Sequence, residues 1–161
     1  MGFDSSCRAR LISVNTKSAG SIRTGERRKG EEEQLMGRHV VLIEDEANIT
    51  EAIRFLLSRE GWQVETHADG SDALEVIRAA APDLVILDVM LPGRSGMDIL
   101  RDLRAETGME HLPVLMLTAR GQARDREMAE KAGVSRFMTK PFSNAEVLTA
   151  VRDLHAQAQQ G

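Results

Sequence analysis

The stretch LVILD, residues 84–88, decides the fold class of this chain. Four consecutive apolar residues lead directly into the carboxylate of Asp88. Two other stretches have the same form: VVLI at 40–43 leads into Glu44-Asp45-Glu46, and VLML at 114–117 leads into Thr118. A strand that is apolar on both faces is typical of the middle of a parallel sheet with helices on both sides. The three stretches therefore predict the central strands of such a sheet.

Weaker strand patterns and helical patterns fill the intervals between these stretches. Residues 62–66 alternate between apolar and polar side chains, and a strand is also expected over 134–139, so these two segments fit the edges of the sheet. Because parallel strands need crossover connections, the alternation of five strands with five helices predicts an α/β, doubly wound, five-stranded parallel sheet. The strand types are consistent with the order 2-1-3-4-5, a known order for open sheets of this kind. Helices are expected over 49–57, 73–77, 97–106, 122–132 and 147–154.

The composition fits a globular protein and excludes several other classes. The chain has 161 residues and a net charge of −4, with 29% charged and 3% aromatic residues. A single cysteine excludes a disulfide scaffold, and no apolar run is long enough to span a membrane. We therefore expect a cytoplasmic domain without a membrane span.

The charge also divides the chain into two unlike parts. Residues 1–37 carry +2 and show no apolar period, whereas residues 38–161 carry −6. We expect 1–37 to be a disordered, basic, Ser-rich arm, or an over-long start if translation begins at Met36. The folded domain is expected over 38–156, followed by a short tail at 157–161.

Chemically active side chains are expected to meet at one edge of the sheet. The carboxyl ends of parallel strands lie at the same edge, which brings Glu44, Asp45, Asp88, Thr118 and Lys140 together. Converging carboxylates repel one another unless they share a cation, and oxygen ligands of this kind suit Mg²⁺. Asp88, as a carboxylate ionised at neutral pH, can attack a phosphoryl donor without a base, with the Lys140 ammonium and the Thr118 hydroxyl stabilising the transferred group.

Each of these residues also has an ordinary structural interpretation when it is taken alone. The acidic run at 44–46 would complement a helix N-terminus, and Thr118 would suit a turn. Pro141 would fit the first turn of a helix with Lys140 simply solvated, and Phe137 would be core packing. Their coincidence at adjacent strand ends favours a common site.

From Arg38 to Leu154 the sequence resembles the receiver domain of response regulators in bacterial two-component systems. The form that it resembles is the stand-alone, chemotaxis-type single-domain regulator, with a flavodoxin-like fold. The matching stretches occur in the family's order and spacing: VVLIEDE at 40–46, LVILDVMLPGRSG at 84–96, VLMLTA at 114–119 and FMTKPF at 137–142.

The resemblance assigns a role to each matching residue. It implies that Asp88 is the phosphoacceptor, and that Mg²⁺ is held by Glu44, Asp45, Asp88 and the backbone carbonyl of Met90. It also implies that Thr118 and Lys140 sense the phosphoryl group, that Phe137 is the aromatic switch residue, and that the Lys140–Pro141 peptide is cis. Met90 and Arg120 match the positions that tune dephosphorylation.

The function implied is that of a phosphoryl-accepting switch and not of an enzyme. Asp88 would accept the group from a histidine kinase or a histidine phosphotransfer protein, or from small donors with Mg²⁺, and would lose it slowly. The change would spread to the surface of the fourth helix, fifth strand and fifth helix, and so regulate an effector protein. Few residues follow Leu154 and the folded part is acidic, so neither an attached output domain nor direct DNA binding is expected.

Two alternatives remain open from the sequence, and a third is argued against. The chain could be a pseudo-receiver that binds partners without phosphorylation, or an intermediate in a phosphorelay. A related aspartyl-phosphate phosphatase would normally need a second Asp two residues after the nucleophile, where this chain has Met90.

Overall fold

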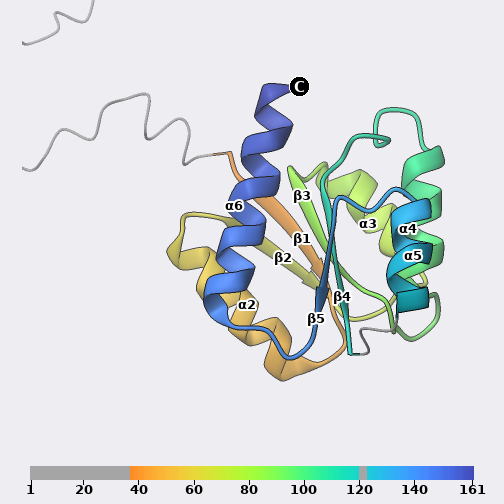
Figure 1. Cartoon of the computed structure of the whole chain (residues 1–161). Coiled ribbons are helices and arrows are strands. Elements are labelled where there is room, and N and C mark those ends of the chain that lie inside the picture. Colours follow the sequence, from red (N-terminus) through yellow and green to blue (C-terminus); the bar gives the residue numbers. More distant parts are fainter. Residues whose placement is uncertain (1–36, 120–122) are drawn as a thin grey trace, which may run out of the picture.

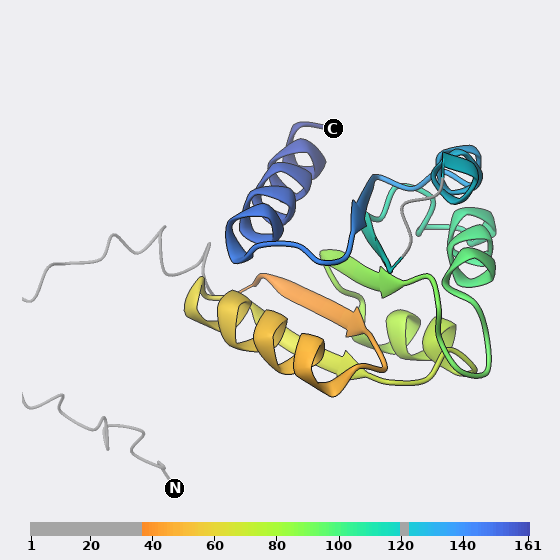
Figure 2. The same ribbon diagram turned by 60° about the horizontal axis from the view of Figure 1, so that its bottom comes forward.

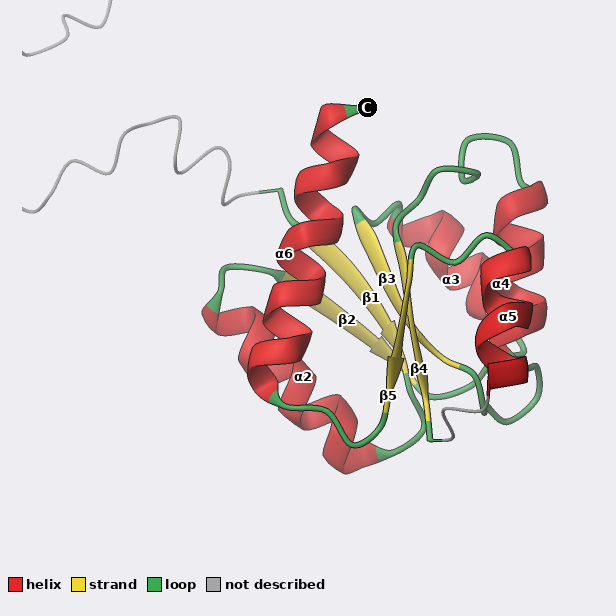
Figure 3. Ribbon diagram, viewed as in Figure 1, coloured by secondary structure: helices red, strands yellow, loops and turns green. Residues whose placement is uncertain are grey.

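The computed structural model describes residues 37–119 and 123–161. These residues form one sheet of five strands in which all neighbouring strands are parallel, as the arrows of Figure 3 show. The strand order is β2-β1-β3-β4-β5, which confirms the predicted class and order. The strands are β1 (His39–Ile43), β2 (Gln63–His67), β3 (Leu84–Asp88), β4 (Val114–Thr118) and β5 (Arg136–Thr139).

Helices cover both faces of the sheet, as predicted. Helices α2 and α6 lie on one face, and α3, α4 and α5 lie on the other (Figures 1 and 2). The helices are α2 (Ala47–Arg59), α3 (Ala73–Ala80), α4 (Gly96–Ala105), α5 (Ala123–Lys131) and α6 (Asn144–Gln160).

The alternation of side chains along each central strand supplies both faces with core residues. In β1, Val40 and Leu42 pack with α2 and α6, whereas Val41 and Ile43 pack with α3 and α4. Strands β3 and β4 are buried along their whole length, and the edge strands β2 and β5 are largely exposed. Burial on both faces explains why the three central strands are continuous apolar runs.

Several element boundaries differ from those expected from the sequence, and for two of them the structure shows the reason. Strand β5 begins at Arg136 and not at Val134, because the amide of Val134 donates to the carbonyl of Ala129 in α5, at 3.0 Å. Helix α6 continues past Leu154 to Gln160, so most of the residues set apart as a tail are helical. This last turn consists of Ala and Gln, which are good helix formers and need no core contact.

Part of the expected organisation falls outside the described residues. The proposed arm up to residue 36, the alternative start at Met36, and Arg120 belong to this part, and the division at 38–156 stays a prediction. Within 37–119 and 123–161, no helix combines the length and the apolar character needed to cross a membrane.

Helix α6 is held to the start of β2 by an aromatic contact. The imidazole of His155 packs edge-on against Trp62, with ring centroids 5.1 Å apart. The guanidinium carbon of Arg38 lies 5.9 Å from the centroid of the Trp62 ring. Burial, together with the Arg38 charge, lowers the pKa of His155 below its ordinary value, against a smaller opposing effect of Asp83. A neutral His155 therefore fits this position better than a charged one.

We expect acidic pH to weaken the fold through His155. Because its pKa is lower in the folded than in the unfolded chain, its contribution to the free energy of unfolding is lost as the pH falls below about 6.5. In His155→Gln this loss should disappear, while His111→Gln, which changes an exposed histidine, should keep it. Urea unfolding between about pH 8 and pH 5 measures the effect. Equal pH dependence of the wild type and His155→Gln would contradict it.

Candidate functional site

The carboxyl edge of the sheet brings together side chains from four strand ends. Glu44 follows β1, Asp88 ends β3, Thr118 ends β4, and Lys140 follows β5. Backbone hydrogen bonds hold neighbouring strand ends side by side. The amide of Lys140 donates to the carbonyl of Thr118 at 2.6 Å, and the amide of Glu44 donates to the carbonyl of His67, at the end of β2, at 2.9 Å. Residues that are far apart in sequence thus become neighbours because every strand runs in the same direction.

The Lys140 ammonium lies between three carboxylates. Its Nζ atom is 2.9 Å from Asp88 Oδ2, 2.8 Å from Glu44 Oε2 and 2.9 Å from Glu46 Oε1. The side chains of Lys140, Asp88 and Glu44 are 10%, 3% and 0% exposed, so solvent screens these charges little. Lys140 is therefore the internal counter-ion of an acidic cluster formed by Glu44, Glu46 and Asp88.

Both carboxylate oxygens of Asp88 are occupied. Oδ2 accepts from Lys140, and Oδ1 accepts a hydrogen bond of 3.0 Å from the backbone amide of Met90. The side chain of Met90 is 72% exposed, so its amide and not its side chain belongs to the site. Gly96 packs closely against the backbone of Asp88, and a β-carbon at this position would collide with the carbonyl oxygen of Asp88.

Glu44 is fully buried, and its two carboxylate oxygens have unlike surroundings. Its Oε1 accepts a hydrogen bond of 2.9 Å from the amide of Glu46, whereas its buried Oε2 makes an ion pair with Lys140 without aligned hydrogen-bond geometry. Burial raises the pKa of Glu44 to about 7, the neighbouring Asp88 adds to the rise, and the contacts with Lys140 and the Glu46 amide oppose it. Burial alone would lower the pKa of Lys140, but its bonds to Asp88, Glu44 and Glu46 outweigh burial and raise that pKa.

The acidic residues differ in part from those expected. Among the residues that the structure describes, the carboxylate oxygens that lie within 4.8 Å of one another come from Glu44, Glu46 and Asp88. Asp45 is exposed and lines a shallow pocket beside the cluster with Thr50, Glu51 and His67. Glu46 is not among the predicted site residues, because an acid just before a helix is explained by the helix dipole alone. Its position two residues after Glu44, on the same side of an extended chain, is the sequence signal that points to the cluster.

The remaining expected residues lie around the cluster. Thr118 is buried at the end of β4, and the Lys140–Pro141 peptide is cis. Phe137 is half-buried in β5, pairs in register with Met116, and packs with the core beneath α3, α4 and α5. The carbonyl oxygen of Met90 stays a proposed ligand, and Arg120 lies outside the described residues.

The cluster fits a hard divalent cation. Three carboxylates face a single ammonium, and the buried Glu44 Oε2 lacks an aligned donor in the described part of the chain. Oxygen donors of this type suit Mg²⁺.

Comparison with known proteins agrees with this arrangement. The family model of the response regulator receiver domain matches residues 40–152. A putative response regulator from Chloroflexus aurantiacus is similar over 74% of this chain and 98% of its own, with 30% identity and a TM-score of 0.71. The beryllofluoride-activated N-terminal receiver domain of RstA from Klebsiella pneumoniae has 31% identity and a TM-score of 0.67, over 73% of this chain and 98% of its own.

The chemotaxis protein CheY4 of Vibrio cholerae has the same fold. It is 26% identical, covers 73% of this chain and 98% of its own, and superposes with a TM-score of 0.69. Domains of this family are signalling switches of two-component systems, for which phosphorylation and Mg²⁺ binding in an acidic pocket are typical. The chain belongs to the response regulator receiver domain family.

Proposed function

We propose that this chain is a Mg²⁺-dependent phosphoryl-accepting switch with Asp88 as the acceptor. The observation that carries the proposal is the contact between the Lys140 ammonium and Asp88 Oδ2 at 2.9 Å, next to two further carboxylates. A nucleophilic carboxylate, a cation and a cation-binding acidic cluster are the parts that phosphoryl transfer to an aspartate needs.

The transfer needs no general base in this arrangement. An oxygen of Asp88 attacks the phosphorus of a phosphohistidine on a kinase or a phosphotransfer protein. The new O–P bond forms as the P–N bond breaks, and the electron pair passes to the imidazole, which takes a proton from solvent. Lys140 has three N–H donors, so it can shift one from Asp88 to a phosphoryl oxygen without leaving the cluster. The Thr118 hydroxyl, at the end of the neighbouring strand, is the proposed second donor.

The resident cation would be held by Asp88 and the acidic residues after β1. Glu44 and Glu46 join Asp88 in the cluster, and we retain Asp45 and the Met90 carbonyl as further proposed ligands. When bound, Mg²⁺ supplies neutralisation of the negative charge that the phosphoryl group brings. The protein's own contribution is to hold the buried Asp88 carboxylate between the Met90 amide and the Lys140 ammonium.

The proposed switch acts through α5. Of the described residues of this helix only Ala129 is buried, and Met128 is 37% exposed, so few core contacts resist its movement. Capture of a phosphoryl group by Thr118 and Lys140 would leave space for Phe137 to turn inward. The surface formed by α5, β5 and α6 would then change and regulate an effector protein, while a sensor histidine kinase or a histidine phosphotransfer protein supplies the phosphoryl group.

Hydrolysis would reset the switch. Water attacks phosphorus, the O–P bond to Asp88 breaks, and phosphate leaves with the carboxylate restored. Met90 and Arg120 are the proposed tuning positions for this step. The family membership also makes the cytoplasm the proposed location, without direct DNA binding by this domain.

Incubation with acetyl phosphate and Mg²⁺ tests the acceptor directly. Wild-type protein should gain one phosphoryl group per chain, detected by intact-mass spectrometry, and EDTA should abolish the gain. Asp88→Asn should gain none. Asp153→Asn changes a half-exposed carboxylate on α6 that is paired with Arg136 of β5, and this variant should behave like the wild type.

Two results would overturn the proposal. A phosphoryl group retained by Asp88→Asn would place the acceptor elsewhere. A wild type that gains none would favour the pseudo-receiver alternative. A separate outcome, passage of the group from Asp88 onward to a histidine, would identify the chain as a phosphorelay intermediate.

A further inference from the structure

The loop between β3 and α4 controls how Asp88 is presented. It covers residues 89–95, and its Met90 amide donates the hydrogen bond of 3.0 Å to Asp88 Oδ1. Because the Met90 side chain is 72% exposed, its own packing cannot fix that amide. The carbonyl of Val89, which belongs to the same peptide unit, accepts from the amide of Gly96 at 3.0 Å. The position of the Met90 amide therefore depends on how the loop closes onto the start of α4 and on what anchors the rest of the loop.

One anchor is the neighbouring loop between β2 and α3. The amide of Gly70 donates to the carbonyl of Pro92 at 2.9 Å, and the amide of Arg94 donates to the same oxygen at 3.0 Å. The two loops touch backbone to backbone: a β-carbon on Gly70 would collide with the carbonyl of Arg94. Gly93, with φ of +79°, leaves no room for a β-carbon beside Ser71.

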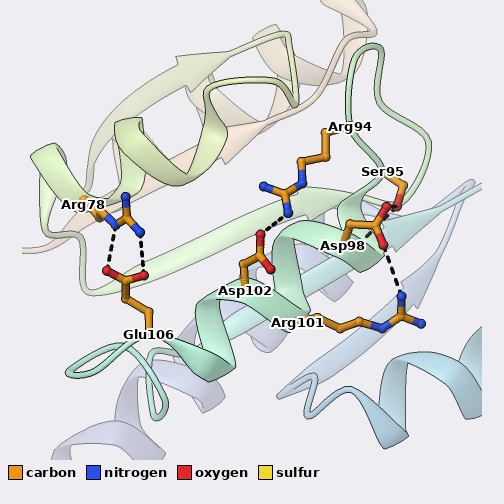
Figure 4. Close-up of polar contacts among 7 residues, drawn as sticks. All are labelled: Arg78, Arg94, Ser95, Asp98, Arg101, Asp102 and Glu106. Atoms are coloured by element: carbon orange, nitrogen blue, oxygen red, sulfur yellow. Dashed lines mark hydrogen bonds and ion pairs between the residues drawn. The ribbon is translucent and has the colours of Figure 1, made fainter.

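The second anchor is an ion pair with α4. Figure 4 shows the guanidinium of Arg94 reaching from the loop to the carboxylate of Asp102. Both side chains are between one third and two fifths exposed, so the pair contributes little to overall stability. It nevertheless joins the loop to the second turn of the helix that follows it.

The acids of α4 show why Asp102 is the partner that matters. Asp98 and Asp102 of α4 and Glu106, the residue that follows the helix, are spaced at intervals of four residues, and each binds an arginine (Figure 4). Asp98 pairs with Arg101 of the same helix, and Glu106 pairs with Arg78 of α3. Of these ion pairs, the one with Asp102 reaches the loop that carries the Met90 amide. Asp98 also contacts the loop, but through the hydroxyl of Ser95 at 2.9 Å and not through its ion pair with Arg101.

We propose that Arg94 is a positioning residue for the phosphoacceptor. Its ion pair with Asp102 holds the loop on one side while Gly70 holds it on the other, and together they keep the Met90 amide on Asp88 Oδ1. The inference rests on the proposed function of Asp88. A displacement of about 1 Å at a reacting group can cost up to about 100-fold in rate, so a loop anchor on the surface can affect the reaction.

The test compares Arg94→Ala with Arg101→Ala. Both remove an arginine paired with an acid of α4, but only Arg94 belongs to the loop. In Arg94→Ala we expect the initial rate of phosphorylation by acetyl phosphate at saturating Mg²⁺ to fall about 3- to 10-fold. Hydrogen exchange at the Met90 amide should quicken, and Arg101→Ala should match the wild type in both measurements.

Further variants separate positioning from stability. Asp102→Asn should reproduce the effect of Arg94→Ala, the double variant should be no slower than either single one, and Arg94→Lys should restore part of the rate. Gly70→Ala should slow phosphorylation as well, while Gly37→Ala, where a β-carbon meets no atom within 4 Å, should not.

The outcomes distinguish this inference from the proposed function. If the wild type is phosphorylated and Arg94→Ala equals Arg101→Ala in rate and in Met90 exchange, the positioning role of Arg94 is overturned, while the proposed function of Asp88 stands. A lower Tm in Arg94→Ala without a change in rate or exchange would overturn it too, because that is the result of a purely structural pair. If the wild type takes no phosphoryl group, the proposed function fails and the inference fails with it.

Discussion

The structure depends on one electrostatic constraint, which is that three carboxylates share one edge of the sheet. The buried Glu44 and Asp88 and the more exposed Glu46 would repel one another, and the Lys140 ammonium, within 2.9 Å of each, offsets that repulsion. The compensation is incomplete, because one ammonium faces three carboxyl groups. The raised pKa of Glu44, about 7, is the local consequence of burial in this cluster. This shortage of positive charge favours the binding of a divalent cation, and it favours a rearrangement of Lys140 within the cluster.

The doubly wound sheet supplies the geometry for this cluster. Strand order β2-β1-β3-β4-β5 places the ends of β1, β3 and β4 next to one another, and β5 brings Lys140 in from the side. The central strands are apolar on both faces and buried, so their ends are fixed by the core and not by the loops. The loops then add the finer contacts, such as the amide of Met90 on Asp88 and the approach of Gly96 to the Asp88 carbonyl.

The sequence predicts the parts of this arrangement that follow from strand periodicity. The run at 84–88 places Asp88 at a strand end, and the parallel arrangement brings it to Lys140 without any knowledge of side-chain angles. The exact acidic partners depend on torsions just beyond a strand, where one residue of difference turns a side chain to the other side. That is why Glu46 joins the cluster and Asp45 does not. The link from Arg94 to Asp102 depends on the path of a loop, which has no periodicity to reveal it. The length of α6 was underestimated because its last turn carries no apolar pattern.

The most direct test of the account is the thermal unfolding of Lys140→Met with and without Mg²⁺. If Lys140 is the internal counter-ion, the variant in EDTA should have a lower Tm than the wild type, since the carboxylates are left uncompensated. Mg²⁺ should then raise its Tm by more than it raises that of the wild type or of Lys131→Met, which changes an exposed lysine on α5. A Mg²⁺-induced rise in Lys140→Met that is no larger than in the wild type would contradict the account.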